Sequence, residues 1–285
     1  MQLGDFEITA VTDGHFRLDG GSMFGIVPRV LWEKKITPDD QHRIRLVVRC
    51  LLVRNGKRTV LIDAGLGNKF SDEFRDRYAV EQPVTLIENL QKAGVRPEDV
   101  TDVINCHLHF DHAGWNTIRQ DGQVVPTFPN ARYWSQRGEW ERARDYAAQR
   151  DRASFVPDDF LPLERERWEL VEGDHAVLPG MELLVLPGHT PHTQGVLLTA
   201  GEQKVAFLED LIPTAYHVPY AWIMAFDLHA AGTLETKRKV LPRAVREKWI
   251  CVFDHDPHLV AARIAEDSRG RLSVVPAEGF SDNAG

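Results

Sequence analysis

The sequence predicts an α/β protein in which two similar halves pack sheet on sheet, with helices on the outside. One observation is the order of elements: strands, a helix and a polar loop in the first half, then strands and a helix again in the second. The other is that histidine and aspartate recur directly after short apolar runs, where a strand ends and a loop begins. No residue-level repeat is visible, so the predicted similarity lies in the order of elements alone.

Alternating and continuous apolar segments predict strands early in the chain. Residues 6–12 alternate apolar and polar side chains, and Asp13-Gly14 indicates a turn. Residues 44–54 and 58–63 are expected to pair around an Asn-Gly turn. Between the strand at residues 6–12 and the strand at residues 44–54, residues 15–40 include a Gly-rich apolar stretch without a clean helical or strand period. We interpret residues 15–40 as an N-terminal arm or lid, with a loop packed on the core as the alternative.

The middle and end of the chain predict helices separated by short strands. Helical spacing predicts helices over residues 83–93 and 234–247. Residues 135–168, rich in Arg, Glu and Asp, are expected to form a helical excursion with a solvated charged face, which is also a candidate contact in a homodimer. The tail beyond residue 276 is expected to fray. The remaining strands are expected at residues 168–171, 182–186, 195–199, 204–208 and, as the final core strand, 249–253.

Composition narrows the class of protein. The formal net charge is −8 with no basic block, which argues against a nucleic-acid partner. The three cysteines are widely spaced and odd in number, which favours buried thiols in a reduced compartment. Neither a secretory signal nor an apolar run long enough to cross a bilayer is visible. We therefore expect a cytoplasmic protein with no membrane partner.

The most informative stretch is residues 105–114, which read Asn-Cys-His-Leu-His-Phe-Asp-His-Ala-Gly. The apolar run Val103-Ile104 leads into it, so it reads as a strand that ends in a tight loop. Imidazole nitrogen and carboxylate oxygen are donors that suit zinc, iron(II), manganese or cobalt. The alternative is a solvated loop without a ligand role. The candidate ligands here are His107, His109, Asp111 and His112.

Three further candidate ligands lie at predicted strand ends. His189 sits in a Pro-Gly-His-Thr-Pro loop, Asp210 follows an apolar run, and His255 follows another. A loop at a strand end can direct each of them back toward the first cluster. The thiol of Cys106, next to His107, is expected to be buried at the strand end and not to be a ligand.

Taken in order, these residues resemble the pattern of the metallo-β-lactamase superfamily: His-x-His-x-Asp-His, then a single His, a bridging Asp and a last His. The resemblance covers essentially the whole chain. It implies one domain over residues 1–285, folded as an αββα sandwich of two mixed β-sheets flanked by helices. It also implies two divalent metal ions, with zinc as the first choice and iron, manganese or cobalt as alternatives.

The resemblance assigns ligands to each ion. His107, His109 and His189 would hold one ion, while Asp111, His112 and His255 would hold the other. Asp210 would bridge the two. Asp63 stands in the Asp-x-Gly position of the superfamily and would support a ligand imidazole.

Within the superfamily, the sequence is most similar to the branch of quorum-quenching N-acyl-homoserine lactonases. The motifs that carry this are His-Leu-His-Phe-Asp-His-Ala-Gly at 107–114, Gly-His-Thr-Pro at 188–191 and Asp-Leu-Ile-Pro-Thr at 210–214. Residues 23–32 resemble the arm of lactonase-like members. Two positions depart from the branch. Pro213 stands where a tyrosine is typical, and His192 stands where the loop often continues Gly-His.

The resemblance implies a hydrolase that uses a hydroxide between two divalent ions to open a lactone or cleave an ester, with an N-acyl-homoserine lactone as the first choice of small-molecule substrate. Asp111 is expected to move the proton, and Tyr216 or His217 to hydrogen-bond the reacting oxygen. An apolar wall of Phe24, Trp32, Trp222, Tyr216 and Phe226 could hold an acyl chain, although such aromatics also serve as core. The alternatives are another esterase or a phosphotriesterase on the same site, and a non-catalytic metal-binding scaffold.

Overall fold

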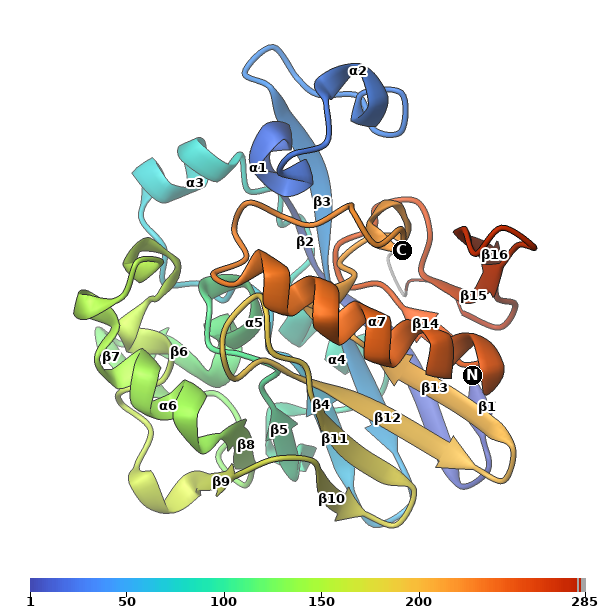
Figure 1. Ribbon diagram of the computed structural model, residues 1–285. Helices are drawn as coiled ribbons and strands as arrows, with labels where there is room; N and C mark the ends of the chain where they lie inside the picture. The colour runs from blue at the N-terminus through green and yellow to red at the C-terminus, as the bar shows by residue number, and fades with distance from the viewer. Residues whose placement is uncertain (281, 283–285) are drawn as a thin grey trace.

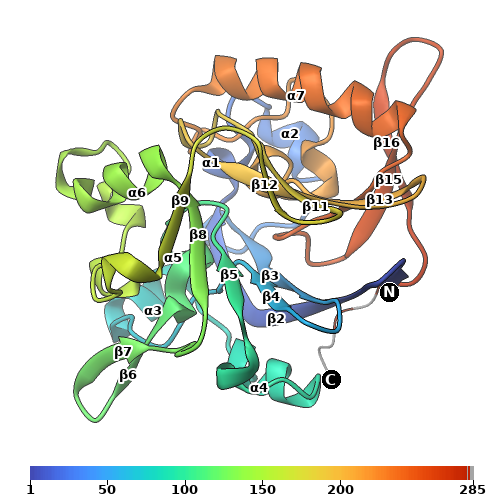
Figure 2. The same cartoon turned by 90° about the horizontal axis from the view of Figure 1, so that it is seen from below.

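The two sheets of the molecule face each other, and helices cover the outer side of each. The computed structural model describes residues 1–280 and 282. In that part of the chain, two sheets have seven strands each, and a separate hairpin pairs β6 (Thr117–Gln120) with β7 (Gln123–Pro126) (Figure 1). Figure 2 shows α7 (Ala230–Arg246) and α4 (Leu86–Lys92) on opposite outer sides, with the strands between them. This arrangement confirms the predicted αββα fold class.

The first sheet has the strand order β1-β2-β3-β4-β5-β8-β9. Antiparallel pairing joins β2 to β3 and β3 to β4, whereas β4, β5, β8 and β9 run parallel. The chain passes from β4 to β5 through α4, which begins after Thr85 and not at Pro83, because Thr85 and Glu88 form a capping box. The strands are β1 (Gln2–Leu3), β2 (Phe6–Asp19), β3 (Arg43–Arg54), β4 (Thr59–Ile62), β5 (Asp102–Ile104), β8 (Arg132–Gln136) and β9 (Trp168–Val171).

The second sheet has the order β10-β11-β12-β13-β14-β15-β16. Its neighbours are antiparallel except for β13 and β14, which run parallel and are connected through α7. A hairpin, a helix and a parallel strand therefore follow one another in both halves, as the sequence predicts. The strands are β10 (His175–Leu178), β11 (Met181–Val185), β12 (Gln194–Ala200), β13 (Gln203–Phe207), β14 (Ile250–Val252), β15 (Ala261–Glu266) and β16 (Leu272–Pro276).

Two predictions about strands are wrong. The turn at Asp13-Gly14 does not exist, because β2 continues through it with a bulge between Thr12 and His15. The inward-facing Asp13 carboxylate accepts five hydrogen bonds there, so Asp13 connects neighbouring segments and does not reverse the chain. The strand at 249–253 is not the final one, since β15 and β16 extend the sheet beyond it.

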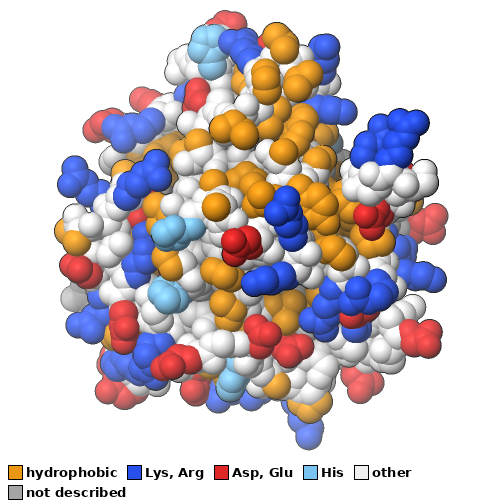
Figure 3. All heavy atoms as spheres, viewed as in Figure 1, with side chains coloured by type: hydrophobic (Ala, Val, Ile, Leu, Met, Phe, Trp, Pro, Cys, Tyr) orange, Lys and Arg blue, Asp and Glu red, His pale blue; other side chains and the backbone are white. Residues whose placement is uncertain are grey.

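The remaining helices are short. Residues 15–40 continue β2 to Asp19 and then form α1 (Gly20–Phe24) and α2 (Arg29–Trp32). The exposed apolar side chains Ile26, Val30 and Leu31 lie on this arm, and Figure 3 shows hydrophobic side chains gathered over its side of the molecule. The other helices are α3 (Asp72–Tyr78), α5 (Phe110–Ala113) and α6 (Arg137–Arg144), and the 3-10 turns are η1 (Pro97–Asp99), η2 (Gly114–Asn116), η3 (Tyr146–Ala148), η4 (Arg152–Ser154), η5 (Pro157–Asp159), η6 (Arg165–Arg167), η7 (Glu209–Leu211) and η8 (Ala215–His217).

The excursion over residues 135–168 contains α6 and four of the 3-10 turns. Its charged residues are not all solvated, since Glu139 and Asp159 are buried. At the other end of the chain, the Asp282 carboxylate accepts from the buried Arg49 guanidinium at 2.6 Å, so this tail residue is held on β3. Residues 281 and 283–285, on which the expectation of fraying also falls, lie outside the described residues.

The main core lies between the sheets. Ile8, Leu51 and Ile104 from the first sheet pack with Val196 and Phe207 from the second. Separate apolar layers lie under α4 and under α7. Within residues 1–280 and 282, every helix is too short or too polar to cross a membrane.

The Glu247 carboxylate ties the end of α7 to the second sheet and gives a pH-dependent prediction. It accepts hydrogen bonds from Lys204, from Arg243 at 3.0 Å and from the Trp249 indole at 3.0 Å. The Lys204 hydrogen bond and its companions lower the pKa of Glu247 from 4.5 to about 2. A carboxylate with a lowered pKa contributes stability above its unfolded pKa and loses it as the pH falls toward the folded value.

We expect Glu247→Gln to lower the free energy of unfolding by about 1 kcal/mol at pH 7. The difference from the unmodified protein should shrink between pH 4.5 and pH 2, the range set by the two pKa values. Urea denaturation across this pH range measures it, with the exposed Glu202→Gln as control. A difference that stays constant with pH would contradict the assignment.

Candidate metal centre

The seven candidate ligands lie together at one edge of the two sheets. His107 and His109 lie in the loop after β5, and Asp111 and His112 belong to the short helix α5. The other three residues follow strands of the second sheet: His189 comes after β11, Asp210 lies in η7 after β13, and His255 comes after β14. All seven are buried. Strand ends of both sheets therefore deliver the ligands to one place.

The loop that carries the first motif is held against the loop after β4. The Ala64 N–H donates to the His112 carbonyl at 2.8 Å, and the Gly114 N–H donates to the Gly65 carbonyl at 2.7 Å. A Cβ atom at Gly114 would lie 2.1 Å from the Leu66 carbonyl oxygen, so only glycine fits this approach.

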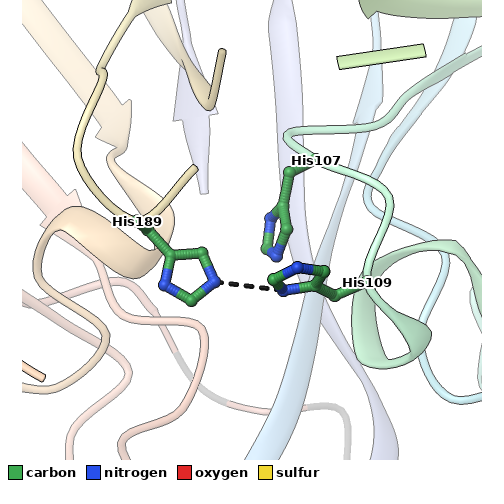
Figure 4. A group of neighbouring side chains, drawn as sticks. All are labelled: His107, His109 and His189. Atoms are coloured by element: carbon green, nitrogen blue, oxygen red, sulfur yellow. Dashed lines mark hydrogen bonds between the residues drawn. The ribbon is translucent and has the colours of Figure 1, made fainter. Parts of the chain in front are cut away.

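One group of ligands consists of three imidazoles. Figure 4 shows His107, His109 and His189 directed toward one another from two loops. Their candidate ligand nitrogens lie within 4.8 Å of one another. His189 Nε2 is 3.1 Å from His109 Nδ1. These are the three residues that the sequence assigns to one ion.

Asp210 lies between this group and the other ligands. Its Oδ2 atom is 3.2 Å from His189 Nε2, 3.8 Å from His107 Nε2 and 3.7 Å from His112 Nε2. Its Oδ1 atom is 3.6 Å from His255 Nε2. A single carboxylate thus faces imidazoles of both predicted sites, which is the placement that a bridging ligand requires.

Asp111 completes the second group. Its Oδ1 atom is 3.6 Å from His112 Nε2, and its Oδ2 atom is 3.7 Å from His255 Nε2. Together with Asp210, these residues surround the space where the sequence places the second ion. A further buried acid, Asp254, adjoins them, since one of its oxygens lies 3.3 Å from His255 Nε2.

The chemistry of this donor set fits divalent metal ions. Both ring nitrogens of His107, Nε2 of His112 and both carboxylate oxygens of Asp254 are buried without a hydrogen-bond partner among the described residues. Buried polar atoms without partners are costly unless a metal or hydrogen bond satisfies them. Burial also lowers the pKa of His107 well below its usual value, which keeps this imidazole in the neutral form that binds metals.

Each ligand imidazole has its other nitrogen beside a carboxylate or carbonyl oxygen, with hydrogen-bond geometry in every case except His107 Nδ1, which is a close contact. Such contacts fix the orientation of the ring and raise its basicity as a ligand. The pairs are His107 Nδ1 with Glu209 Oε1 (2.5 Å), His109 Nε2 with Asp151 Oδ2 (2.8 Å), His112 Nδ1 with Asp63 Oδ2 (2.9 Å), His189 Nδ1 with Asp227 Oδ1 (3.1 Å) and His255 Nδ1 with the Val47 carbonyl (2.9 Å).

The sequence identified Asp63 alone among these supporting groups. Glu209 directly precedes Asp210, so its position next to a ligand in the sequence could have indicated a supporting role. Asp151 lies in the excursion that we interpreted as a solvated face, and Asp227 lies in a loop without a recognisable pattern. Asp63 and Glu209 both have positive φ, at 58° and 56°. A left-handed backbone is unfavourable for such residues and is typical of functional sites.

A cavity of about 310 Å³ opens onto the ligands. Asp111, Asp210, His109, His189 and His255 form its floor. Its walls combine apolar and cationic side chains. They include Met23, Tyr78, Phe110, Met224, Phe226, Arg17, Arg43 and Arg77.

Most residues that the sequence suggested for substrate contact do not line this cavity, Phe226 being the exception. Phe24 packs against Trp32, His217 and Trp222, with ring centroids 4.9 to 5.6 Å apart. His217 is buried, and both its ring nitrogens are engaged, one with Thr214 and one with the Met23 carbonyl. These aromatics form the core of the arm, which was the alternative interpretation.

Tyr216 and Cys106 also lie away from the cavity wall. Tyr216 is half-buried in η8 and packs on the same aromatic cluster. Cys106 is buried, its backbone N–H donates to Asp63, and burial raises the pKa of its thiol well above the usual value. Cys106 is therefore buried as expected, whereas Tyr216, six residues after Asp210, is absent from the cavity lining.

The profile of the metallo-beta-lactamase superfamily matches residues 43–255, which is most of the chain and includes all seven candidate ligands. The chain belongs to the metallo-β-lactamase superfamily. An N-acyl homoserine lactonase of Bacillus cereus is 28% identical over 230 residues, which are 75% of this chain and 82% of that protein. The protein is therefore an enzyme of the hydrolase type, with lactonases among its relatives.

Solved structures of the superfamily agree with this fold. A probable metal-dependent hydrolase from Staphylococcus aureus superposes with a TM-score of 0.87 at 25% identity, covering 99% of this chain and 100% of that one. AidC, a dizinc quorum-quenching lactonase, superposes with a TM-score of 0.80 at 22% identity, covering 99% and 97%. At 22% identity, the similarity to AidC shows the fold alone.

The contact between Glu209 and His107 gives a prediction about metal affinity. Glu209→Gln keeps the side-chain size but removes the carboxyl group that lies 2.5 Å from His107 Nδ1. We expect metal affinity to fall by about 10- to 100-fold, as for other groups that orient a ligand imidazole. Competition with a chromophoric chelator measures it. The exposed Glu202→Gln is the matched control, and equal affinities for the two variants would contradict the role of Glu209.

Proposed function

We propose that the protein opens a lactone ring with two divalent metal ions held by the seven-residue cluster, and that an N-acyl-homoserine lactone is the first substrate to test. The observation that carries this proposal is the position of Asp210, whose two oxygens face imidazoles of both groups. The similarity to N-acyl homoserine lactonases supports the choice of substrate. Zinc is the proposed metal, because histidine nitrogens and carboxylate oxygens are donors that it prefers.

The proposed ligands are those that the sequence assigned, with Asp210 shared. When bound, two such ions would lower the pKa of a water molecule and polarise a carbonyl oxygen. The chain itself positions the ester group, because the floor of the cavity is made of ligands and its walls are side chains of the arm, α3 and the loop around residue 225.

Two residues of the cavity are placed to handle protons. Asp111 reaches both the cavity and the ligands His112 and His255, so it can accept the proton of an attacking water and pass it to the leaving alkoxide. In a lactone this alkoxide stays tethered to the product, so no separate amine leaving group has to be protonated. Tyr78, at the end of α3, is the tyrosine among the residues that line the same cavity, in place of Tyr216, and is the proposed donor to the reacting oxygen.

We expect Tyr78→Phe to lower kcat by about 100-fold, the effect typical of losing one donor to a developing oxyanion. KM should change little, because the ring remains packed on Phe74 and Phe110. Steady-state kinetics with a lactone substrate measures the two parameters. Tyr220→Phe is the control, since Tyr220 lies outside the cavity lining. Equal losses in both variants, or a change in KM alone, would contradict this role for Tyr78.

The experiment that tests the proposed function is a substrate panel with zinc-loaded protein. Ring opening of acyl-homoserine lactones of increasing chain length is followed as proton release, beside an aryl ester and a phosphotriester. The proposal expects the lactones to have the highest kcat/KM. A phosphotriester that exceeds them would move the assignment to phosphotriester hydrolysis, which the same cluster can support.

A further inference from the structure

The cavity above the ligands has a cationic wall that the ring opening of a neutral lactone does not use. Arg17 of β2, Arg43 of β3 and Arg77 of α3 all line it. Beyond the ligands Asp111 and Asp210, the one acidic residue in the lining is Asp19. Its Oδ1 atom accepts the Ser22 N–H at the start of α1. Besides the two ligand carboxylates, the lining thus contains three arginines and one acidic residue, although the chain as a whole carries a net charge of −8.

Two of these arginines have partners in the fold. Arg43 donates to the Asp39 carboxylate at 2.9 Å and to the Arg77 carbonyl at 3.0 Å, so it joins β3 to the end of α3. Arg77 donates to Glu73 at 2.7 Å on an exposed face of α3. Both contacts are structural, and neither arginine is the strongest candidate for binding a ligand.

Arg17 differs from them. Its side chain is 24% exposed, and the one carboxylate oxygen within 4.0 Å of it in the described part of the chain is Glu81 Oε1, at 3.8 Å. That distance is beyond a hydrogen bond. Glu81 is already engaged, because its other oxygen accepts from Arg45 at 2.9 and 3.3 Å. Arg17 thus lines the cavity with a largely buried side chain that has no dedicated carboxylate partner in the described part of the chain.

We infer that the substrate of this cavity carries an anionic group, a carboxylate, on the part that lies away from the ester bond, and that Arg17 binds it. This inference rests on the proposed function and narrows its substrate class. The planar fork of a guanidinium matches a carboxylate with two parallel hydrogen bonds. Met23, Met224 and Phe226 line the same cavity and suit a short methylene chain between the two ends. A short acyl chain ending in a carboxylate matches all these groups.

The test measures binding, so it does not depend on turnover. Isothermal titration calorimetry with metal-loaded protein compares adipamate, which carries a carboxylate and a carboxamide on a six-carbon chain, with the neutral hexanamide. Three variants are compared with the unmodified protein. Arg17→Met removes the charge at similar length, and Arg17→Lys keeps the charge without the fork. Arg54→Met, at the far end of β3 beside Glu7, is the matched control for net charge.

The unmodified protein should bind adipamate about 10- to 100-fold more tightly than hexanamide, the factor that a charge-assisted hydrogen bond supplies. Arg17→Met should remove this preference, Arg17→Lys should keep part of it, and Arg54→Met should leave it unchanged. Equal affinity for the two compounds in the unmodified protein would overturn the inference. A preference that survives in Arg17→Met would also overturn it, because the carboxylate would then bind elsewhere, such as at the metal ions. Failure of the proposed function shows separately, as absence of lactone turnover in a protein that still prefers adipamate.

Discussion

Replacing Asp210 with alanine should abolish hydrolysis while the fold remains. The Asp210 carboxylate faces the Nε2 atoms of His107, His112, His189 and His255 at 3.2 to 3.8 Å, so its removal takes away the ligand placed between the two groups. Although burial opposes ionisation, the surrounding imidazoles lower the pKa of Asp210 to about 2, which keeps it charged as a ligand must be. Loss of metal assistance raises a barrier by several kcal/mol, so turnover should fall by roughly 1,000-fold or more.

The measurement pairs kcat with metal content. Asp210→Ala should hold less metal than the unmodified protein when both are dialysed against the same buffer and analysed by plasma emission. The exposed Asp40→Ala provides the control for loss of a carboxylate. Full turnover by Asp210→Ala would exclude a reaction that depends on a shared ligand.

Asp13→Ala should be the most destabilising single substitution outside the ligands. Its fully buried carboxylate accepts from five donors: the N–H groups of Leu66, Gly67 and Leu86, the Gln82 amide and the Trp115 indole. These donors belong to the loop after β4, to the start of α4 and to the end of the metal-ligand loop, which is the segment after β5 that carries His107, His109, Asp111 and His112. Each buried donor left without an acceptor costs about 1–3 kcal/mol.

Relaxation and water entry will recover part of this cost, so we expect the free energy of unfolding to fall by about 4 kcal/mol or more. Urea denaturation measures it. Asp13→Asn should lower the free energy of unfolding by less, because its amide oxygen can still accept hydrogen bonds. Part of the loss remains, since its NH₂ group faces donors. A loss under about 1 kcal/mol in Asp13→Ala would show that these five contacts are not needed to hold the loops.

Much of the fold and of the ligand set follows from local sequence pattern. Ligands occur where apolar strands end, and parallel strand ends meet at one edge, so His107, His189 and His255 could be predicted to converge. The repeated element order predicted two halves packed sheet on sheet, and the resemblance carried by the ligand motif implied the αββα fold class. Edge strands such as β10 and β16 were missed because they are short and half exposed, without a clean alternation.

Supporting groups other than Asp63 were missed for a different reason. Asp13 resembles a turn residue locally, yet it is an acceptor for segments more than fifty residues away. Asp151, in the charged excursion, contacts His109 only because the excursion folds back over the metal-ligand loop. The cavity likewise depends on which side of α1 faces inward. Met23 lines it, while Phe24, the next residue, packs behind the wall.

The central claim is that two metal ions act together at this cluster. Its most direct test is a titration of metal-free protein with zinc, in which lactone ring opening is recorded as proton release at each addition. We expect turnover to reach its maximum at two zinc equivalents per chain. Full turnover at one equivalent, or in the presence of a chelator that leaves the protein metal-free, would contradict the two-metal account.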